Sequence, residues 1–289
     1  MPPYLWEGAL RPMPEMPEMQ ALAERLDVLV GGATLEGATP LAISGLKTFH
    51  PAPSALSGKV VGAVTRRGKF LVFDLGGLRL LVHLSQGGRV DVESPPKRTR
   101  PKGAVVRFNF EQRPSVLIKE YGSHRKAGWW VLAEDDEGPL AKLGPEALSE
   151  DFAHLVATGA DRRRLNTLLR DQRTVAGIGR GYTDDILHAA RLSPYTTLTK
   201  LTGEERRSLQ EATAEVLRRG LKSERKRTGG LPTKIQGRFA VHGHAGEPCL
   251  CCGSSLARVS YESYEMVYCP QCQTGGRVLA DRAQSQFLR

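Results

Sequence analysis

Four cysteines close to the C-terminus have the clearest chemical meaning in this chain of 289 residues. Cys249 and Cys252 form one C-x2-C pair, and Cys269 and Cys272 form a second pair after a gap of sixteen residues. Two such turns present four thiolates to one tetrahedral Zn²⁺ and leave no open position for water. The spacing therefore predicts one structural zinc ion. Cys251 remains as an odd thiol that competes with its neighbours as a ligand.

The segment between the two pairs, LARVSYESYEMVY, suits a β-hairpin that carries the second cysteine turn back to the first. Four unligated or redox-active thiols are the alternative interpretation of the same residues. A zinc hairpin does not by itself identify a partner, because ribosomal, transcription and chaperone proteins also contain such hairpins.

The charge and composition of the chain limit the classes of molecule that it is expected to bind. Lys and Arg exceed Asp and Glu by 41 − 31 = 10, and 40% of the residues are hydrophobic, so a packed core is feasible. The excess of positive charge favours a polyanion, which includes nucleic acid, a membrane surface or an acidic protein. No apolar run approaches the roughly 18 residues of a membrane span, and the first residues do not have the pattern of a secretory signal. We expect a cytoplasmic protein, associated with the nucleoid if prokaryotic, with no membrane partner.

The elements that position these residues begin with a helix. Pro17–Val30 has apolar residues at three- and four-residue spacing, including Leu22, Leu26 and Leu29. This period gives one apolar face, and the glycine pair that begins at Gly31 ends the helix.

From about residue 41 to residue 132 the pattern changes to strands. Phe70–Leu75 and Leu78–Leu84 are apolar runs joined by Gly76 and Gly77, which predicts a tight hairpin. Further strands are expected at Val105–Phe110, Val116–Tyr121 and Trp129–Leu132, with a loop at Glu93–Lys102.

After a linker at residues 139–151 the period becomes helical. One helix is expected to begin at Leu165 and to break at the glycines after Ala176, and another is expected to begin at Tyr182. Thr202 and Glu205 form a capping box before a further apolar-periodic helix. The basic segment SERKRTGGLPTK, which begins at Ser223, is expected to be mobile.

Five motifs, taken in order, point to one family. They are MPEMPE at Met13–Glu18, RRGKFLVFDL, HLSQGG, LLRDQRTVAGIGRGYTDDILHAARLSP, and the cysteine finger preceded by VHGHAGEPC and followed by QTGG. Together they resemble the formamidopyrimidine/endonuclease VIII family of DNA glycosylases over almost the whole chain. The fourth motif is similar to that family's helix–two-turn–helix, in which a glycine-rich turn grips the DNA backbone.

The resemblance implies an α+β protein. An N-terminal β-sandwich with a flanking helix would be followed by a helix–two-turn–helix domain and a zinc-finger β-hairpin. The expected division is a leader or misassigned start at 1–12, a catalytic domain at 13–138, a linker at 139–151, a DNA-binding domain at 152–236 and a zinc module at 237–289.

The resemblance also implies base-excision repair chemistry on damaged double-stranded DNA, by a monomer. The lesion is flipped out of the duplex, and an N-terminal proline amine attacks C1′, displaces the base and leads to strand cleavage by elimination. By this resemblance Pro14 is the nucleophile, Glu15 moves protons, and Lys69 holds a phosphate. An α-amino group has a pKa of about 7.7–8.0, so a useful fraction is neutral at pH 7.

Pro14 is internal in the chain as written, so its nitrogen is an amide and cannot attack C1′. Translation from Met13 followed by methionine removal, or removal of a leader, would expose the amine. Alternatively the first twelve residues are retained and proline chemistry is lost.

The resemblance places the DNA contacts at Gln86, Arg125, Asn166 and Arg180. Asn166 stands where the family usually has lysine, Arg180 where it has asparagine, and Gln86 where many members have methionine. Arginine still binds phosphate, and glutamine can still fill the place of a flipped base.

Three further departures concern DNA grip or lesion readout. Asp185 replaces a glutamate, Ala127 replaces a phenylalanine, and Tyr264 occupies the usual arginine position on the finger hairpin. Two alternatives stay open. The internal Pro14, Asn166 and Arg180 favour a non-catalytic damaged-DNA-binding member of the same fold. A zinc-ribbon protein associated with RNA or transcription is the other, and it leaves MPEMPE unexplained.

Overall fold

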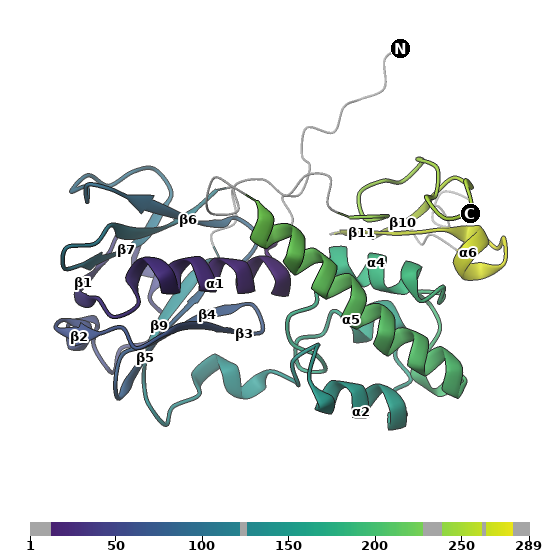
Figure 1. Cartoon of the computed structure of the whole chain (residues 1–289), viewed down its shortest axis with the longest axis horizontal. Coiled ribbons are helices and arrows are strands. Elements are labelled where there is room, and N and C mark those ends of the chain that lie inside the picture. Colours follow the sequence, from purple (N-terminus) through teal and green to yellow (C-terminus); the bar gives the residue numbers. More distant parts are fainter. Residues whose placement is uncertain (1–12, 122–125, 228–238, 262–263, 280–289) are drawn as a thin grey trace, which may run out of the picture.

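The computed structural model describes residues 13–121, 126–227, 239–261 and 264–279. Figure 1 shows a β-sandwich on one side and a helical region with a small hairpin on the other, so the predicted α+β class is confirmed. The helix α1 (Met16–Val30) lies along the sandwich, and the long helix α5 (Gly203–Lys226) crosses from its end into the helical region.

The sandwich consists of two antiparallel sheets. The first has the order β2-β1-β7-β8-β6 and the second the order β3-β4-β5-β9. The strands of the first sheet are β1 (Thr34–Pro40), β2 (Lys59–Val60), β6 (Gly88–Glu93), β7 (Ala104–Phe110) and β8 (Ser115–Glu120). Those of the second are β3 (Val64–Arg67), β4 (Phe70–Asp74), β5 (Leu78–His83) and β9 (Gly128–Ala133).

The expected hairpin is present between β4 and β5. Gly76 and Gly77 both have positive φ, 57° and 80°, which is the backbone that a two-residue hairpin of this hand requires. Between the sheets, Phe108 lies edge-on to Trp129 and beside Phe73, and all three side chains are buried. The remaining predicted strands appear within one residue of their expected ends, whereas β1, β2, β3 and β6 were not predicted as individual strands.

The helical region has a second core. It contains α2 (Glu150–Thr158), α3 (Leu165–Leu168), α4 (Arg180–Ala189), α5 and a 3-10 turn at Leu198–Lys200. Other 3-10 turns lie earlier in the chain, at Ile43–Gly45, Pro53–Leu56 and Gly138–Lys142. Leu165, Ile186, Leu209 and Leu217 are buried in this core, and Met16 from the start of α1 joins them. The predicted capping box of Thr202 and Glu205 is present at the start of α5.

Two expectations about this region need correction. The helix that begins at Leu165 has only four residues, and it is followed by a turn in which the Asp171 carboxylate accepts the N–H of Arg173 at 3.1 Å. Ser223–Lys226, expected to be mobile, is the last turn of α5. Residues 228–238, the rest of that basic segment, lie outside the described residues.

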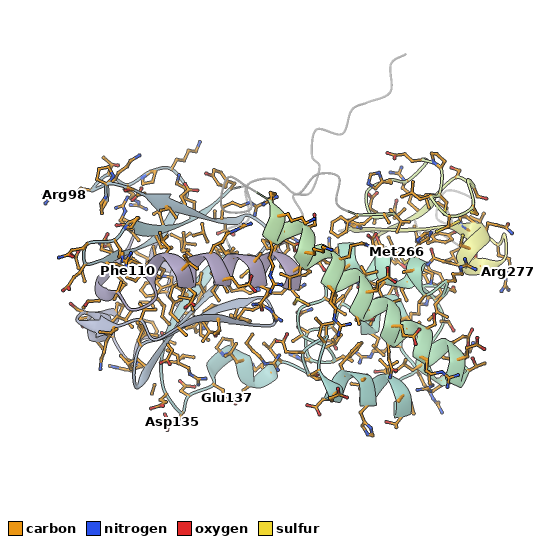
Figure 2. All side chains as sticks on the ribbon, viewed as in Figure 1. Arg98, Phe110, Asp135, Glu137, Met266 and Arg277 are labelled. Atoms are coloured by element: carbon orange, nitrogen blue, oxygen red, sulfur yellow. The ribbon has the colours of Figure 1, made fainter. Side chains whose placement is uncertain are left out.

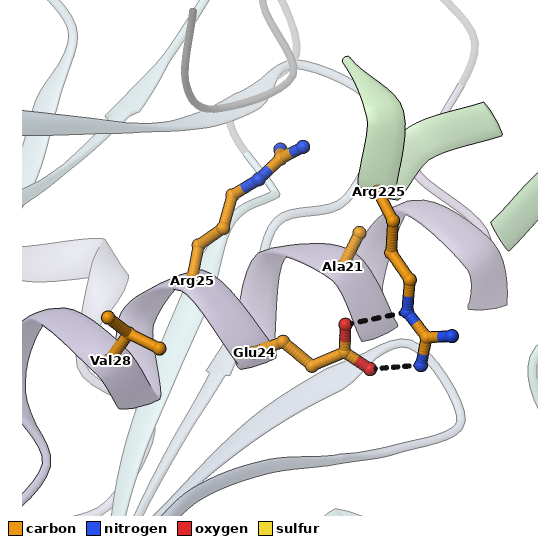
Figure 3. A pocket seen from close by; sticks show the side chains of 5 residues that line it. All are labelled: Ala21, Glu24, Arg25, Val28 and Arg225. Atoms are coloured by element: carbon orange, nitrogen blue, oxygen red, sulfur yellow. Dashed lines mark hydrogen bonds and ion pairs between the residues drawn. The ribbon is translucent and has the colours of Figure 1, made fainter. Parts of the chain in front are cut away.

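The two halves of the chain are joined by contacts between α1 and α5 (Figure 3). The Glu24 carboxylate on α1 accepts two hydrogen bonds from the Arg225 guanidinium at 2.9 and 2.6 Å. Arg25 donates to the backbone carbonyls of Glu224 and Arg227 at the C-terminal end of α5. The end of α5 is therefore anchored to α1, with a shallow hollow between them lined by these side chains, Ala21 and Val28.

A third contact runs through the expected linker. The Glu146 carboxylate accepts hydrogen bonds from the guanidinium groups of Arg66 and Arg67, and from the N–H of Gly68 at 2.6 Å. These residues flank the turn between β3 and β4, which carries Lys69. The linker therefore fixes the base of that turn. Within the described part of the chain, no helix has the length and apolar character needed to span a membrane.

Candidate active site and nucleic-acid interface

Glu15 lies at the junction of the two halves. Its side chain is 2% exposed, and it caps the N-terminus of α1. The carboxylate accepts hydrogen bonds from the N–H groups of Gly179 and Gly181, the latter at 2.9 Å, at the start of α4. The N–H groups at the N-terminus of α4 therefore orient this carboxylate.

Lys69 converges on the same point from the sandwich. A Cβ atom placed on Gly179 would lie 2.5 Å from Cδ of Glu15 and 2.7 Å from Nζ of Lys69. Only glycine therefore leaves room for the carboxylate and the ammonium to meet at this turn. The sequence predicted both charged residues, but not that a glycine 164 positions away brings them together.

Burial lowers the pKa of the Lys69 ammonium, which is 4% exposed, while the negative charges of Glu15 and Glu18 act in the opposite direction. Arg180 and Arg170 also lower the pKa, because their positive charges face the same region. The positive charges of Lys69, Arg170 and Arg180 therefore act in the same region as the buried carboxylates of Glu15 and Glu18. Such a site attracts an anion such as a phosphate.

Pro14 is buried directly before Glu15. The N–H of Met16, two residues after Pro14, donates to the Gly177 carbonyl at 2.9 Å. Glu18 accepts from the N–H of Glu15 at 2.7 Å and from the Tyr182 hydroxyl at 2.9 Å. Glu18, whose role the sequence left undefined, therefore holds the Pro14–Glu15 segment against α4.

The four residues expected to contact DNA have different positions. Gln86 is exposed on the β5–β6 loop, where Arg89 donates to its carbonyl at 3.2 Å. Asn166 is 2% exposed, and its amide nitrogen lies 3.2 Å from Sδ of Met266. Met266, labelled in Figure 2, belongs to β11 (Tyr264–Tyr268). Arg180 is the first residue of α4, and Arg125 lies outside the described residues.

The departures from the family pattern occupy defined places. The Asp185 carboxylate accepts hydrogen bonds from three successive N–H groups, those of Ala240, Val241 and His242. It therefore joins α4 to the chain that enters the cysteine module. Ala127 is buried, with its N–H donating to Glu120 at 3.0 Å. The backbone of Tyr264 pairs with Tyr261 in the hairpin.

The four predicted cysteines form one cluster. Their Sγ atoms lie within 4.8 Å of one another, with 3.9 Å between those of Cys249 and Cys272 and 3.5 Å between those of Cys252 and Cys269. Tetrahedral ligation with Zn–S bonds of about 2.3 Å requires S···S distances of about 3.8 Å, so the cluster can hold a metal ion. Cys251 is exposed and outside this set.

The cluster is supported by a hairpin and a short helix. Strands β10 (Ala257–Tyr261) and β11 (Tyr264–Tyr268) pair in antiparallel register, as the sequence predicted, and α6 (Pro270–Thr274) follows. Nε2 of His188 on α4 lies 3.2 Å from Sγ of Cys249. An imidazole N–H at this distance stabilises a thiolate, and the sequence offered no signal for this contact because it joins residues 61 positions apart.

Comparison with known proteins agrees with this geometry. A model of the formamidopyrimidine-DNA glycosylase N-terminal domain matches residues 13–130, and a model of the H2TH domain of the same enzymes matches residues 143–230. The formamidopyrimidine-DNA glycosylase of Thermus thermophilus is 34% identical over 283 residues, which cover 91% of this chain and all of that protein. An uncharacterised formamidopyrimidine-DNA glycosylase-like protein of Mycobacterium tuberculosis is 40% identical over 154 residues, 51% of this chain and 94% of its own length.

Solved structures have the same fold. The crystal structure of the Thermus thermophilus MutM (Fpg) protein superposes with a TM-score of 0.76 at 32% identity, over 90% of this chain and 98% of that one. A Lactococcus lactis Fpg mutant in complex with Fapy-dG-containing DNA superposes with a TM-score of 0.79 at 24% identity, over 90% and 100%.

The sandwich, the glycine-rich turn between α3 and α4 and the cysteine hairpin define a protein of the helix–two-turn–helix class. The chain belongs to the formamidopyrimidine-DNA glycosylase family. The family resemblance predicted from the sequence is thereby confirmed.

Proposed function

We propose that this protein excises damaged bases from double-stranded DNA and cleaves the resulting abasic site when Pro14 is its N-terminal residue. The observation that carries the proposal is the convergence of Glu15 and Lys69 on Gly179, directly beside Pro14. The relatives that match over the full chain are named as DNA glycosylases, and one solved relative contains damaged DNA.

The proposed reaction uses groups of this chain alone. The Pro14 secondary amine attacks C1′ of the flipped nucleotide, and the glycosidic bond to the base breaks as the C1′–N bond forms. Glu15 delivers or accepts the protons that this exchange requires. The C1′–O4′ bond then breaks, O4′ takes up a proton, and the resulting C1′ iminium acidifies the C2′ protons. Loss of one of them expels the 3′ phosphate, so the strand breaks by elimination.

Lys69 has a binding role in this proposal. Its buried ammonium lies beside Glu15 and within reach of the positive charges of Arg170 and Arg180. A phosphate next to the lesion would be held by these cations and would place C1′ against the Pro14 nitrogen. Gln86 on its exposed loop would occupy the space of the extruded base, and Arg125 would contact the opposite strand.

The chemistry requires a free amine, and the family model begins its match at residue 13. This supports a mature chain that begins at Pro14, after Met13 is removed. We further propose a single structural Zn²⁺ held by Cys249, Cys252, Cys269 and Cys272, and a monomer that acts in the cytoplasm on chromosomal DNA.

Borohydride trapping on an abasic-site duplex tests the amine mechanism. Protein made from Met1 and protein made from Met13 are compared, and the crosslinked peptide is mapped. A covalent adduct at Pro14 in the shorter form alone supports the proposal. If neither form is trapped, the lyase mechanism is wrong.

The second candidate is a damaged-DNA-binding protein without catalysis. It is favoured by the uncharged Asn166, whose amide nitrogen lies 3.2 Å from Sδ of Met266. Product analysis on lesion-containing and abasic duplexes separates the two, because this candidate predicts selective binding with no released base and no cleaved strand.

A further inference from the structure

Arg164 is an exposed cation held in a fixed orientation. It directly precedes α3, and its Cζ lies 3.8 Å from the ring centroid of Tyr195. No carboxylate is paired with it anywhere in the ranges that the structure describes. Stacking on an aromatic face restrains a guanidinium but leaves its N–H donors, which lie in the plane of the group, available to a ligand.

The ring under Arg164 is itself anchored. The Tyr195 hydroxyl lies 3.1 Å from the hydroxyl of Tyr261, the last residue of β10. Burial and this hydrogen bond raise the pKa of Tyr261, while the charge of Arg164 and a hydrogen bond from Asn166 lower it. The four side chains therefore adjoin one another where the helical region meets the cysteine hairpin.

Two neighbouring arginines, Arg163 and Arg170, are already hydrogen-bonded to other groups. Arg163 is held by the carboxylates of Asp161 and Asp171, each at 2.6 Å. Arg170 donates through Nε to the Asn166 carbonyl at 2.7 Å. Its charge is also felt by Lys69 in the candidate active site.

These contacts connect the cations of the candidate active site to Arg164. Lys69, Arg180 and Arg170 lie around the candidate active site, and Asn166 links Arg170 to the Tyr195–Tyr261 platform that carries Arg164. Asn166 itself supplies no charge, because its side chain is a neutral amide, and the amide nitrogen contacts Met266. A duplex seated at Lys69 would pass a further backbone phosphate over Arg164.

We propose that Arg164 binds a backbone phosphate of the bound duplex and supplies the cation that position 166 lacks in this chain. The inference rests on the proposed function, because it assumes that DNA lies across the Glu15–Lys69 site. Planar guanidinium and phosphate pair through two parallel hydrogen bonds, so the contact positions the duplex without reading its sequence.

Binding of two fluorescent duplexes tests this proposal, one with a tetrahydrofuran abasic analogue and one undamaged. Full-length Arg164→Gln is compared with wild type and with Arg162→Gln, a matched control at an exposed arginine two residues away. Affinities are measured at several salt concentrations. Arg164→Gln should weaken binding to both duplexes by roughly five- to tenfold, as expected for loss of one charged hydrogen-bonded contact.

The salt dependence gives an independent readout. Loss of one phosphate contact should reduce the slope of log K against log salt by about 0.9 for Arg164→Gln, with no change for Arg162→Gln. A slope and affinity equal to wild type would overturn the proposal. Loss of affinity with an unchanged slope would also overturn it, because it would indicate a structural effect.

Failure of the proposed function has a different signature. If protein made from Met13 forms no borohydride adduct but Arg164→Gln still reduces the salt slope, the catalytic proposal fails and the phosphate contact stands. If the adduct forms and the slope is unchanged, the Arg164 proposal alone fails.

Discussion

The imidazole of His242 and the carboxylate of Asp184 are joined by a hydrogen bond of 2.7 Å between Nδ1 and Oδ2. The same carboxylate accepts the N–H of Val267 on β11 at 3.1 Å. One buried side chain on α4 therefore holds both the segment that enters the cysteine module and the hairpin that completes it. Burial raises the pKa of Asp184 to about 6, although the hydrogen bond and charge of His242 act to lower it.

Replacement of Asp184 by alanine should loosen the cysteine module. It leaves the N–H of Val267 and the imidazole of His242 without their acceptor, at a cost of about 3 kcal/mol of unfolding free energy. Asp184→Asn keeps an acceptor oxygen and should cost about 1 kcal/mol. Urea unfolding of the zinc-loaded protein measures both. Equal losses for the two variants would show that the hydrogen bonds do not determine the effect.

Gly179→Ala should disrupt the candidate active site. The added methyl group would overlap Cδ of Glu15 and Nζ of Lys69, and both of these groups are buried. We expect a loss of about 1–3 kcal/mol in stability, the usual cost of overpacking, together with loss of borohydride trapping by the Met13 form.

Gly203→Ala is the matched control for that experiment, because a Cβ there meets nothing within 4 Å. It should change stability by less than about 0.5 kcal/mol and leave trapping unaffected. Normal trapping by Gly179→Ala would show that the close approach of Glu15 and Lys69 is not required for chemistry.

Zinc content should depend on four of the five cysteines. Metal analysis should find one zinc per chain in wild type and in Cys251→Ser, since Cys251 is exposed and outside the cluster. Cys252→Ser should lose the metal, because three thiolates no longer complete the tetrahedron. Chelation of wild type should then abolish duplex binding as the hairpin loses its order. Retention of zinc by Cys252→Ser would indicate that Cys251 replaces it as a ligand.

The features of this protein that depend on residues close together in the chain could be predicted from its sequence. The cysteine spacing, the Gly76–Gly77 turn and the Thr202 capping box depend on residues close in the chain, and each was found where predicted. Strand β1 was missed because TLEGATP carries a glycine, a proline and little apolar alternation. It is held in the sheet by pairing with β7, which lies far away in the sequence.

The site was predicted as a set of residues, and the contacts between them came only from the fold. Glu15 and Lys69 were identified by motif, but the amides of Gly179 and Gly181 that bind Glu15 belong to a different motif and half of the chain. Long-range partners such as Asp184 and His242 have no periodic or spacing signal. The adjacent aspartates of α4 are separated by more than fifty residues from the groups to which they are hydrogen-bonded.

A final prediction concerns His83, the last residue of β5. The centroid of its ring lies 4.7 Å from that of Phe70 on β4. Burial, together with the smaller effect of the positive charge of Lys69, lowers the pKa of His83 to about 4. The folded protein therefore binds a proton at this site less readily than the unfolded chain, in which the pKa is about 6.5. The stability contributed by neutral His83 is fully present above pH 6.5 and is lost as the pH falls towards 4.

At about 1.4 kcal/mol per pH unit, the contribution lost across that interval is at most about 3 kcal/mol. His83→Gln removes the titrating group, so its unfolding free energy should fall less steeply between pH 6.5 and 4 than that of wild type. The difference between the two proteins, measured by urea unfolding at each pH, cancels effects that they share, including protonation of the cysteines. Parallel pH profiles would show that His83 is not kept neutral by its surroundings.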